Sequence, residues 1–401
     1  MKVLLISQVF VPDQAANALL TGSLAAYLTG RGHEVTVLAG PRQDSTDANS
    51  AEDLSERIRV VRPLRGAYTK KRGLPGRLLG FLRLYALVAR HAFSRSRYDV
   101  VLALTTPPFV YVVALLFRRR RGCRVVLWSL DCYPDVAVEA GVITRGGVVH
   151  RFLGAVNRRF YPALDSVIAL DQDMANWLER RGASHATVIP NWESAESYSP
   201  VSEQEATAFR ASVGVAESEL LLLYLGNLGV AHEFETILEA MRKLQTAAAR
   251  VRCVFVGDGV RRRDVERAVR EWGLDNVTLR DFIPKAQTRI ALGASDLGLI
   301  TLRDSMAGLV TPSKMYGCLA MAVPILYVGP HLSEVARVIQ AADCGRTFSR
   351  GDAVGVAEYL ISSTQSRQCL KSAGERGRSY FLSHNESSII LPRFERVLES
   401  A

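Results

Sequence analysis

Short apolar runs alternate with longer amphipathic stretches along most of this chain, and this alternation is the feature that most constrains its fold. Residues 2–7 are apolar and strand-like, residues 18–31 carry leucines at helical spacing, and residues 34–39 are strand-like again. A strand, a helix and a strand within about 40 residues form a βαβ unit, in which the two strands lie parallel in one sheet. The pattern therefore predicts an α/β protein with parallel sheets.

The alternation occurs twice, on either side of a polar stretch. Residues 196–219 are rich in Ser, Glu and Ala and predict a linker that leads into a short helix. Before it, further strands are predicted at 58–61, 100–103, 125–128 and 166–170, and Val188-Ile189-Pro190-Asn191 closes this half. After it, strands are predicted at 220–225, 251–256, 277–280, 297–301 and 325–328, with helices over 235–243, 261–272, 285–293, 314–321 and, last, 389–398. Two such repeats in 401 residues predict two Rossmann-like domains that face one cleft.

Positive charge is concentrated in the first half of the chain. Residues 65–124 hold 14 Lys and Arg side chains and one acid, Asp99, which suggests an anionic partner. Residues 68–97 mix leucines with arginines, and so predict a basic amphipathic helix that lies on an anionic membrane. A solvated helix packed on the sheet is the alternative. Nucleic-acid binding is a third interpretation, although no stacking aromatic motif accompanies the charge.

The composition favours a protein without a structural metal or a membrane-spanning segment. The six cysteines have no paired spacing and predict buried thiols in a reducing compartment, and no two histidines stand at metal-binding i, i+4 spacing. The apolar N-terminal run is too short for a signal peptide. No stretch reaches the roughly 20 apolar residues that a bilayer-spanning helix needs. We therefore expect a cytoplasmic protein with no bound metal.

Two glycine loops and one Pro-Ser-Lys turn are the candidate ligand-binding segments. Gly226-Asn227-Leu228-Gly229 and Gly257-Asp258-Gly259 follow successive strands, and ligands of such sheets bind at the carboxyl ends of the strands. Plain strand-to-helix turns are the alternative, and neither loop has the pattern of an ATP-binding P-loop. Pro312-Ser313-Lys314 opens a helix, where free backbone N–H groups, a hydroxyl and a cation can hold a phosphate.

Acidic residues also follow predicted strands. Asp131 comes after the apolar run 125–130, where its carboxylate could act as a general base or hold a hydroxyl group of a ligand. A helix cap is the alternative, and Asp135 could fill that role instead. Asp171 and Asp173 are predicted to cap a helix.

Five segments, taken in chain order, resemble glycosyltransferases of the GT-B class, family 4, and are similar to those that build O-antigen and exopolysaccharide. These segments are residues 131–141, 188–192, 224–240, 255–262 and 312–320. The resemblance implies a GT-B fold with parallel sheets facing a central cleft. It divides the chain into an N-terminal acceptor-binding domain (1–199), a nucleotide-sugar-binding domain (200–380) and a C-terminal helix that returns to the first domain (381–401).

The resemblance also implies roles for single residues. The donor diphosphate would lie beside Gly226 and Asn227, and the nucleobase beside Phe282 and the backbone of Ile283. The remaining donor-site residues would be Asn17 across the cleft, the loop Gly257, Asp258 and Gly259, the phosphate contacts Arg303, Pro312, Ser313 and Lys314, and Tyr316 near the ribose. Two features of the wider family are absent: Leu309 and Gly317 replace its pair of glutamates, and Asn227 stands where Arg is usual while His232 lies near the usual Lys position.

The implied activity is transfer of a sugar from a nucleotide-sugar, UDP-linked first and GDP-linked second, without a cofactor and with retention of configuration. The acceptor would be a membrane lipid-linked saccharide, and the protein would lie on the inner face of the plasma membrane. Three alternatives remain open at this point: a soluble natural-product glycosyltransferase with a small-molecule acceptor, a UDP-sugar 2-epimerase, and a non-catalytic partner subunit.

Overall fold

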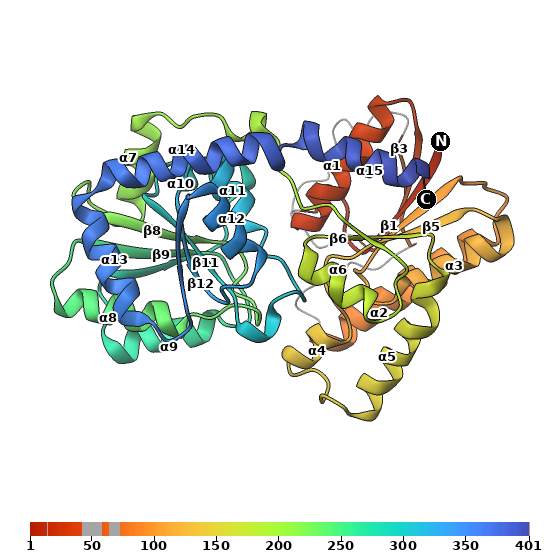
Figure 1. Cartoon of the computed structure of the whole chain (residues 1–401), viewed down its shortest axis with the longest axis horizontal. Helices are drawn as coiled ribbons and strands as arrows, with labels where there is room; N and C mark the ends of the chain where they lie inside the picture. The colour runs from red at the N-terminus through yellow and green to blue at the C-terminus, as the bar shows by residue number, and fades with distance from the viewer. Residues whose placement is uncertain (14, 42–57, 64–72, 401) are drawn as a thin grey trace. The chain divides into compact units, whose positions relative to one another are not determined.

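The structure, a computed structural model, describes residues 1–13, 15–41, 58–63 and 73–400. The chain forms two compact units, Met1–Pro190 together with Ile390–Ala401, and Asn191–Ile389 (Figure 1). Each unit is an α/β layer structure around one parallel sheet. Within the described residues, no helix is both long and apolar enough to cross a membrane.

The first unit contains a seven-stranded parallel sheet in the order β3-β2-β1-β4-β5-β6-β7. Its strands are β1 (Lys2–Ser7), β2 (Glu34–Ala39), β3 (Ile58–Val61), β4 (Val100–Leu104), β5 (Arg124–Trp128), β6 (Ser166–Ala169) and β7 (Ala186–Val188). The central strands are buried throughout, as expected for a parallel sheet covered on both faces. The sequence pattern placed β1 to β6 within a few residues of their observed positions, whereas it did not predict β7 as a strand.

Helices cover both faces of this sheet because the strand order reverses between β1 and β4. Right-handed crossovers then place α1 (Ala16–Gly30) on one face and the later helices on the other. Those later helices are α2 (Gly73–Ala92), α3 (Val110–Arg121), α5 (Val148–Phe160) and α6 (Gln172–Glu179), with the short α4 (Asp135–Glu139) before α5. Helix α2 lies within the predicted basic amphipathic segment, of which residues 68–72 fall outside the described residues.

The C-terminal helix α15 (Ser387–Ser400) packs beside α1 (Figure 1). Its Phe394 meets Trp128 of β5 edge-on, with 4.7 Å between ring centroids, and both side chains are fully buried. Glu395 accepts hydrogen bonds from Tyr27 of α1 (2.8 Å) and from His33 (2.9 Å). Helix α15 is thus an integral part of the first unit, although about 200 residues of the second unit separate it in sequence from the rest of the first unit.

The second unit contains a six-stranded parallel sheet in the order β10-β9-β8-β11-β12-β13. Its strands are β8 (Leu220–Leu225), β9 (Val251–Val256), β10 (Val277–Arg280), β11 (Leu297–Thr301), β12 (Ile325–Val328) and β13 (Gly345–Phe348). Its helices are α7 (Glu203–Ser212), α8 (Glu235–Thr246), α9 (Arg262–Trp272), α10 (Lys285–Gly293), α11 (Lys314–Ala320), α12 (Glu334–Ala342), α13 (Ala353–Gln365) and α14 (Arg367–His384). Side chains alternate between the two faces of β8, with Leu221 and Leu223 in one core and Leu220 and Leu222 in the other.

The boundaries of the units differ from those expected from the resemblance. The first boundary falls at 190/191 rather than 199/200, because Tyr198 belongs to the core of the second unit. The second falls at 389/390 rather than 380/381, because α14 packs against α11 and α12 and buries Phe381 in that same core. Burial of single aromatic side chains therefore decides which unit each connecting segment joins.

Candidate functional site

The loops that follow β8 and β9 lie against each other at the carboxyl edge of the second sheet. The backbone N–H of Gly226 donates to the carbonyl of Val256 at 2.9 Å, and that of Leu228 donates to the carbonyl of Asp258 at 2.9 Å. Gly257 has φ +146°, and a Cβ there would lie 2.0 Å from the Gly226 carbonyl oxygen. The two loops are neighbours, as the sequence predicted, and they approach so closely that only glycine fits.

Lys314 extends from the start of α11 over the first of these loops. Its Cε lies 3.1 Å from the point that a Cβ of residue 226 would occupy. Its Nζ lies 4.8 Å from the centre of the Tyr224 ring, within the range of a cation–π contact. The absence of a side chain at Gly226 is therefore what makes room for Lys314.

His232 holds the ammonium group in this position. Lys314 Nζ donates to His232 Nε2 at 3.1 Å, while His232 Nδ1 lies 2.6 Å from the carbonyl oxygen of Thr301. Since the carbonyl can only accept, Nδ1 carries the proton and Nε2 is the acceptor. Burial lowers the pKa of His232 well below its usual value, and the charge of Lys314 lowers it further, so the ring stays neutral.

The side chain of Lys314 is half-buried and has no acidic partner among the described residues. Burial lowers the pKa of Lys314 to about 7, and no carboxylate among the described residues forms an ion pair with it. A cation in such surroundings gains free energy when an anion arrives, because the anion supplies the missing counter-charge. We call Gly226, His232, Gly257 and Lys314 the glycine–lysine cluster; its chemistry suits a phosphate.

The other predicted phosphate contacts surround this cluster. Ser313 precedes α11, and its exposed hydroxyl makes no capping hydrogen bond with the helix. Pro312 is buried, and Arg303 follows β11, where its backbone N–H donates to the carbonyl of Ala231 at 2.9 Å. Asn227 lies beside Gly259, since a Cβ built on Gly259 would lie 2.8 Å from Asn227 Oδ1.

The segment predicted to bind a nucleobase follows β10 and is linked to the second glycine loop. Arg262 donates to the Gly257 carbonyl at 2.8 Å and to Asp281 Oδ1 at 2.7 Å. Phe282 is half-exposed, and Ile283 packs at the border of the core. An exposed ring next to the cluster leaves an apolar surface on which a base could stack.

Tyr316 differs from its predicted role. Its side chain is 1% exposed and lies in the core of the second unit, so it offers no surface to a ribose. The reason is helical geometry, because two positions along α11 turn the side chain by about 200° relative to Lys314. The cation and the ring therefore face opposite sides of one helix.

Asp131, the predicted catalytic residue, lies at the carboxyl edge of the first sheet. It follows β5, and its backbone N–H and that of Leu130 donate to Oγ1 of Thr105 at 3.2 and 2.9 Å. Burial raises the pKa of Asp131 to about 6. The alternative role as a helix cap is wrong, because α4 begins at Asp135 with Pro134 as its N-cap. A carboxyl group with this pKa suits proton transfer near neutral pH.

Four other polar residues of the first unit were assigned roles from the sequence, and the structure shows where each one lies. Asp171 caps α6 by accepting from the Met174 N–H at 2.8 Å, as predicted, and Asp173 lies in the first turn of that helix. Asp135 is not a cap: it accepts from His150 (2.7 Å) and from the indole of Trp177 (2.8 Å). Asn17 lies in the first turn of α1 rather than in the preceding loop.

Sequence reasoning missed Gln8, which follows β1 at the same sheet edge as Asp131. It is 2% exposed, and neither polar atom of its side chain has a hydrogen-bond partner among the described residues. Gly40 packs directly on it, since a Cβ there would lie 2.3 Å from Gln8 Nε2. Its position immediately after the first predicted strand could have indicated Gln8 as a candidate site residue. A buried amide with unused hydrogen-bonding capacity can serve a ligand's hydroxyl groups.

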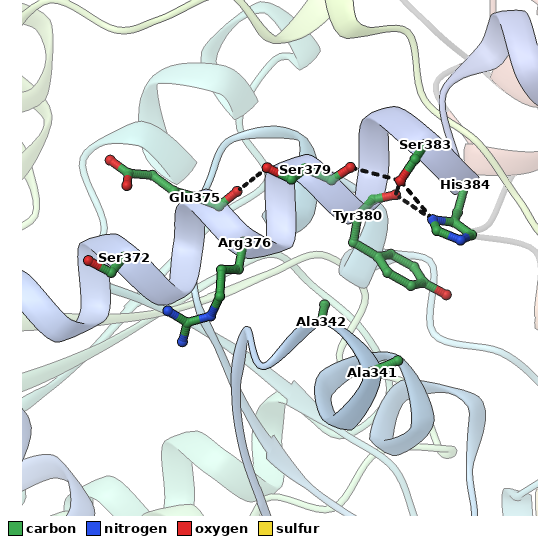
Figure 2. A pocket seen from close by; sticks show the side chains of 9 residues that line it. All are labelled: Ala341, Ala342, Ser372, Glu375, Arg376, Ser379, Tyr380, Ser383 and His384. Carbon is green, nitrogen blue, oxygen red and sulfur yellow. Dashed lines mark hydrogen bonds between the residues drawn. The ribbon is translucent and has the colours of Figure 1, made fainter.

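A surface groove of about 550 Å³ lies elsewhere on the second unit, between α12 and α14 (Figure 2). Tyr380 and His384 stack along it with 4.2 Å between their ring centroids. Ala341 and Ala342 line it from the last turn of α12, which runs antiparallel to the strands. The groove therefore lies toward the amino edge of the sheet, away from the glycine–lysine cluster.

The two parallel sheets and the cluster at the end of β8 define a protein of the GT-B class. The structure of Anabaena HepE in complex with UDP and glucose superposes with a TM-score of 0.75 at 16% identity, covering 100% of both chains, which shows the fold. The family descriptions "Glycosyl transferase 4-like domain" and "Glycosyl transferases group 1" match residues 19–192 and 219–365. The chain belongs to these glycosyltransferases.

Two relatives extend the comparison. WbjE of Pseudomonas aeruginosa, named as a glycosyltransferase, is 27% identical over 72% of this chain and 71% of its own. WcaI of Escherichia coli (strain K12), named for glycosyl transfer in colanic acid biosynthesis, is 24% identical over 85% of this chain and 86% of its own. The similarity thus extends through both units.

Proposed function

We propose that this glycosyltransferase uses a nucleoside-diphosphate sugar, UDP-linked first and GDP-linked second, and transfers the sugar to a lipid-linked saccharide. The observation that carries the donor half is the Lys314 ammonium, held by His232 over Gly226 without an acidic partner among the described residues. The complex of HepE with UDP and glucose supports a UDP-linked donor.

The chemistry requires that the bond between the anomeric carbon and the diphosphate breaks while a bond to the acceptor oxygen forms. Negative charge grows on the leaving diphosphate, and a fixed cation stabilises that charge more in the transition state than before it. Lys314 would supply the cation, and the exposed Ser313 hydroxyl would donate a hydrogen bond. We propose that this set works without a bound metal and with retention of configuration, as in the family that the sequence resembles.

The acceptor half of the proposal concerns the first unit. The acceptor hydroxyl must lose its proton as the new bond forms, and Asp131 is the candidate to accept it. A carboxyl group whose pKa is raised to about 6 is ionised at neutral pH and is still a stronger base than an ordinary aspartate.

The biological setting is proposed from the charge pattern and the relatives. The 14 cations of residues 65–124 and the name of WcaI support work on a polysaccharide intermediate at the cytoplasmic face of the plasma membrane. The acceptor would then be carried by a lipid of that membrane.

Calorimetric titration with UDP, GDP, ADP and dTDP, each with and without EDTA, tests the donor site. We expect one uridine or guanosine nucleotide to bind, and EDTA to leave its affinity unchanged. Binding of none of the four would contradict the donor site and favour a non-catalytic partner subunit. Donor turnover in the absence of any acceptor, with a 2-epimer as product, would instead identify an epimerase.

A further inference from the structure

Helix α5 packs on the first unit through a face that includes two polar side chains, His150 and Asn157. Asn157 is the only buried residue of this helix, all of which the structure describes. Asn157 Nδ2 donates to the Tyr133 carbonyl at 2.7 Å, and its Oδ1 accepts from the Tyr111 hydroxyl at 2.7 Å. Asn157 therefore anchors the C-terminal half of α5 to the unit, where Leu153, Val156 and Phe160 are also partly buried.

A histidine anchors the other half. His150 lies seven positions before Asn157, hence on the same face of the helix. Its Nδ1 accepts from the Gly146 N–H at 3.2 Å, so its Nε2 carries the proton donated to Asp135 at 2.7 Å. Polar contacts at both ends thus hold α5 in a defined orientation.

Apolar side chains occupy the opposite face at the start of the helix. Val148 is 86% exposed, Phe152 is 65% exposed and Val149 is also exposed. We call these three residues the outward face of α5. Single exposed apolar residues are common, but three on adjacent turns of one helix form a patch that marks an interaction surface.

The charges around this patch indicate what covers it. Residues 140–164 contain four arginines and no acidic residue. Arg151, Arg158 and Arg159 are exposed along α5 itself. Apolar side chains surrounded by arginines suit the interface of an anionic bilayer. There the apolar side chains contact the acyl chains and the long arginine side chains reach the headgroup phosphates.

We propose that the outward face of α5 inserts into the surface of an anionic bilayer and fixes the first unit there. Helix α2 belongs to the same helical layer, is packed on α3, and exposes Leu78 and Leu82, so it provides a second contact of the same kind. This membrane contact deepens the proposed function and rests on it in one respect only, that the contact would bring the enzyme to a lipid-linked acceptor. Vesicle binding is measured without donor or acceptor, so the two can fail separately.

The test is co-sedimentation of the full chain with vesicles of phosphatidylglycerol and phosphatidylcholine, compared with phosphatidylcholine alone. The variant carries Val148→Ser and Phe152→Ser, which change only exposed side chains. The matched control is Leu332→Ser, because Leu332 is 82% exposed on the second unit. We expect the double variant to lose about tenfold in partition onto anionic vesicles, and the control to bind like the unaltered chain.

A second variant reports insertion directly. Tryptophan at position 152 (Phe152→Trp) should be quenched by lipids brominated on the acyl chains, whereas Leu332→Trp should not. Unchanged binding of the double variant, or equal binding to neutral vesicles, would overturn the proposal. So would a dimer of the unaltered chain that the double variant converts to a monomer, because a second copy would then cover this face.

Discussion

Replacing Lys314 with methionine tests the donor site most sharply, because it removes the charge and keeps most of the length of the side chain. A hydrogen bond to a charged group contributes about 1.5–3 kcal/mol. Since each 1.4 kcal/mol is about tenfold in affinity, Lys314→Met should weaken binding of the nucleoside diphosphate by about 10- to 150-fold. Folding should be unaffected or improved, because the substitution removes a desolvated charge.

The role of Lys314 also predicts how nucleotide affinity changes with pH. Burial lowers the pKa of Lys314 to about 7 in the free protein, and a bound diphosphate favours the charged form and raises it. Above pH 7 binding must therefore take up a proton, and affinity should fall toward about tenfold per pH unit. Neighbouring His232 stays neutral, and burial raises the pKa of the Cys318 thiol to about 12, so neither titrates in this range.

Calorimetry at several pH values between about 6.5 and 9, in buffers of different ionisation enthalpy, measures both affinity and proton uptake. Lys314→Arg should bind with a flat pH profile, because guanidinium stays charged. His232→Leu removes the acceptor that positions Lys314 and should weaken binding, whereas His232→Gln keeps an acceptor and should restore part of it. Unaltered affinity of Lys314→Met, or no proton uptake by the unaltered chain near pH 8, would refute the reasoning.

Three further predictions concern the rest of the fold and site. Asp131→Asn should lower kcat by about 10²- to 10⁴-fold without changing nucleotide affinity. Activity of the unaltered enzyme should fall below pH about 6, because the Asp131 carboxylate becomes protonated there. Normal turnover by Asp131→Asn would exclude the general-base role. Gly257→Ala should abolish nucleotide binding, because its Cβ would lie 2.0 Å from a backbone oxygen. The control Gly273→Ala, at φ +59° with open space around it, should cost only about 1–2 kcal/mol in a thermal melt and leave affinity unchanged. Phe394→Ala should cost about 3–5 kcal/mol and lower Tm, because it leaves a cavity against the ring of Trp128; an unchanged Tm would contradict the docking of α15.

The fold was largely predictable because its strands are continuous apolar runs. Six strands of the first sheet and five of the second stand out as apolar segments bounded by turn residues, but β7 does not, since none of its residues is buried. The edge strand β13 did not, because Gly345–Phe348 includes an exposed arginine and only one fully buried residue. Helix α5 was also missed, because Val148, Val149 and Phe152 are exposed and its apolar residues therefore do not form a single core-facing stripe.

The candidate site was predictable only as far as local motifs extend. The glycine loops and Lys314 carry their signal in the sequence, as does the cap at Asp171. Tyr316 was misjudged because two residues of one short helix can face opposite sides. The role of His232 depends on its hydrogen bonds with Thr301 and Lys314, which are 69 and 82 residues away in sequence.

The sequence by itself determined the local structure of this protein: where strands and helices form, that the strands run parallel, and which turns require glycine. Those properties depend on hydrophobic period and on backbone sterics, which act over a few residues. Only the tertiary structure decided that Lys314 has no acidic partner among the described residues, that burial raises the pKa of Asp131, and that Val148 and Phe152 of α5 are exposed. Each of these depends on which distant segments exclude water from a given side chain, and no local pattern encodes that.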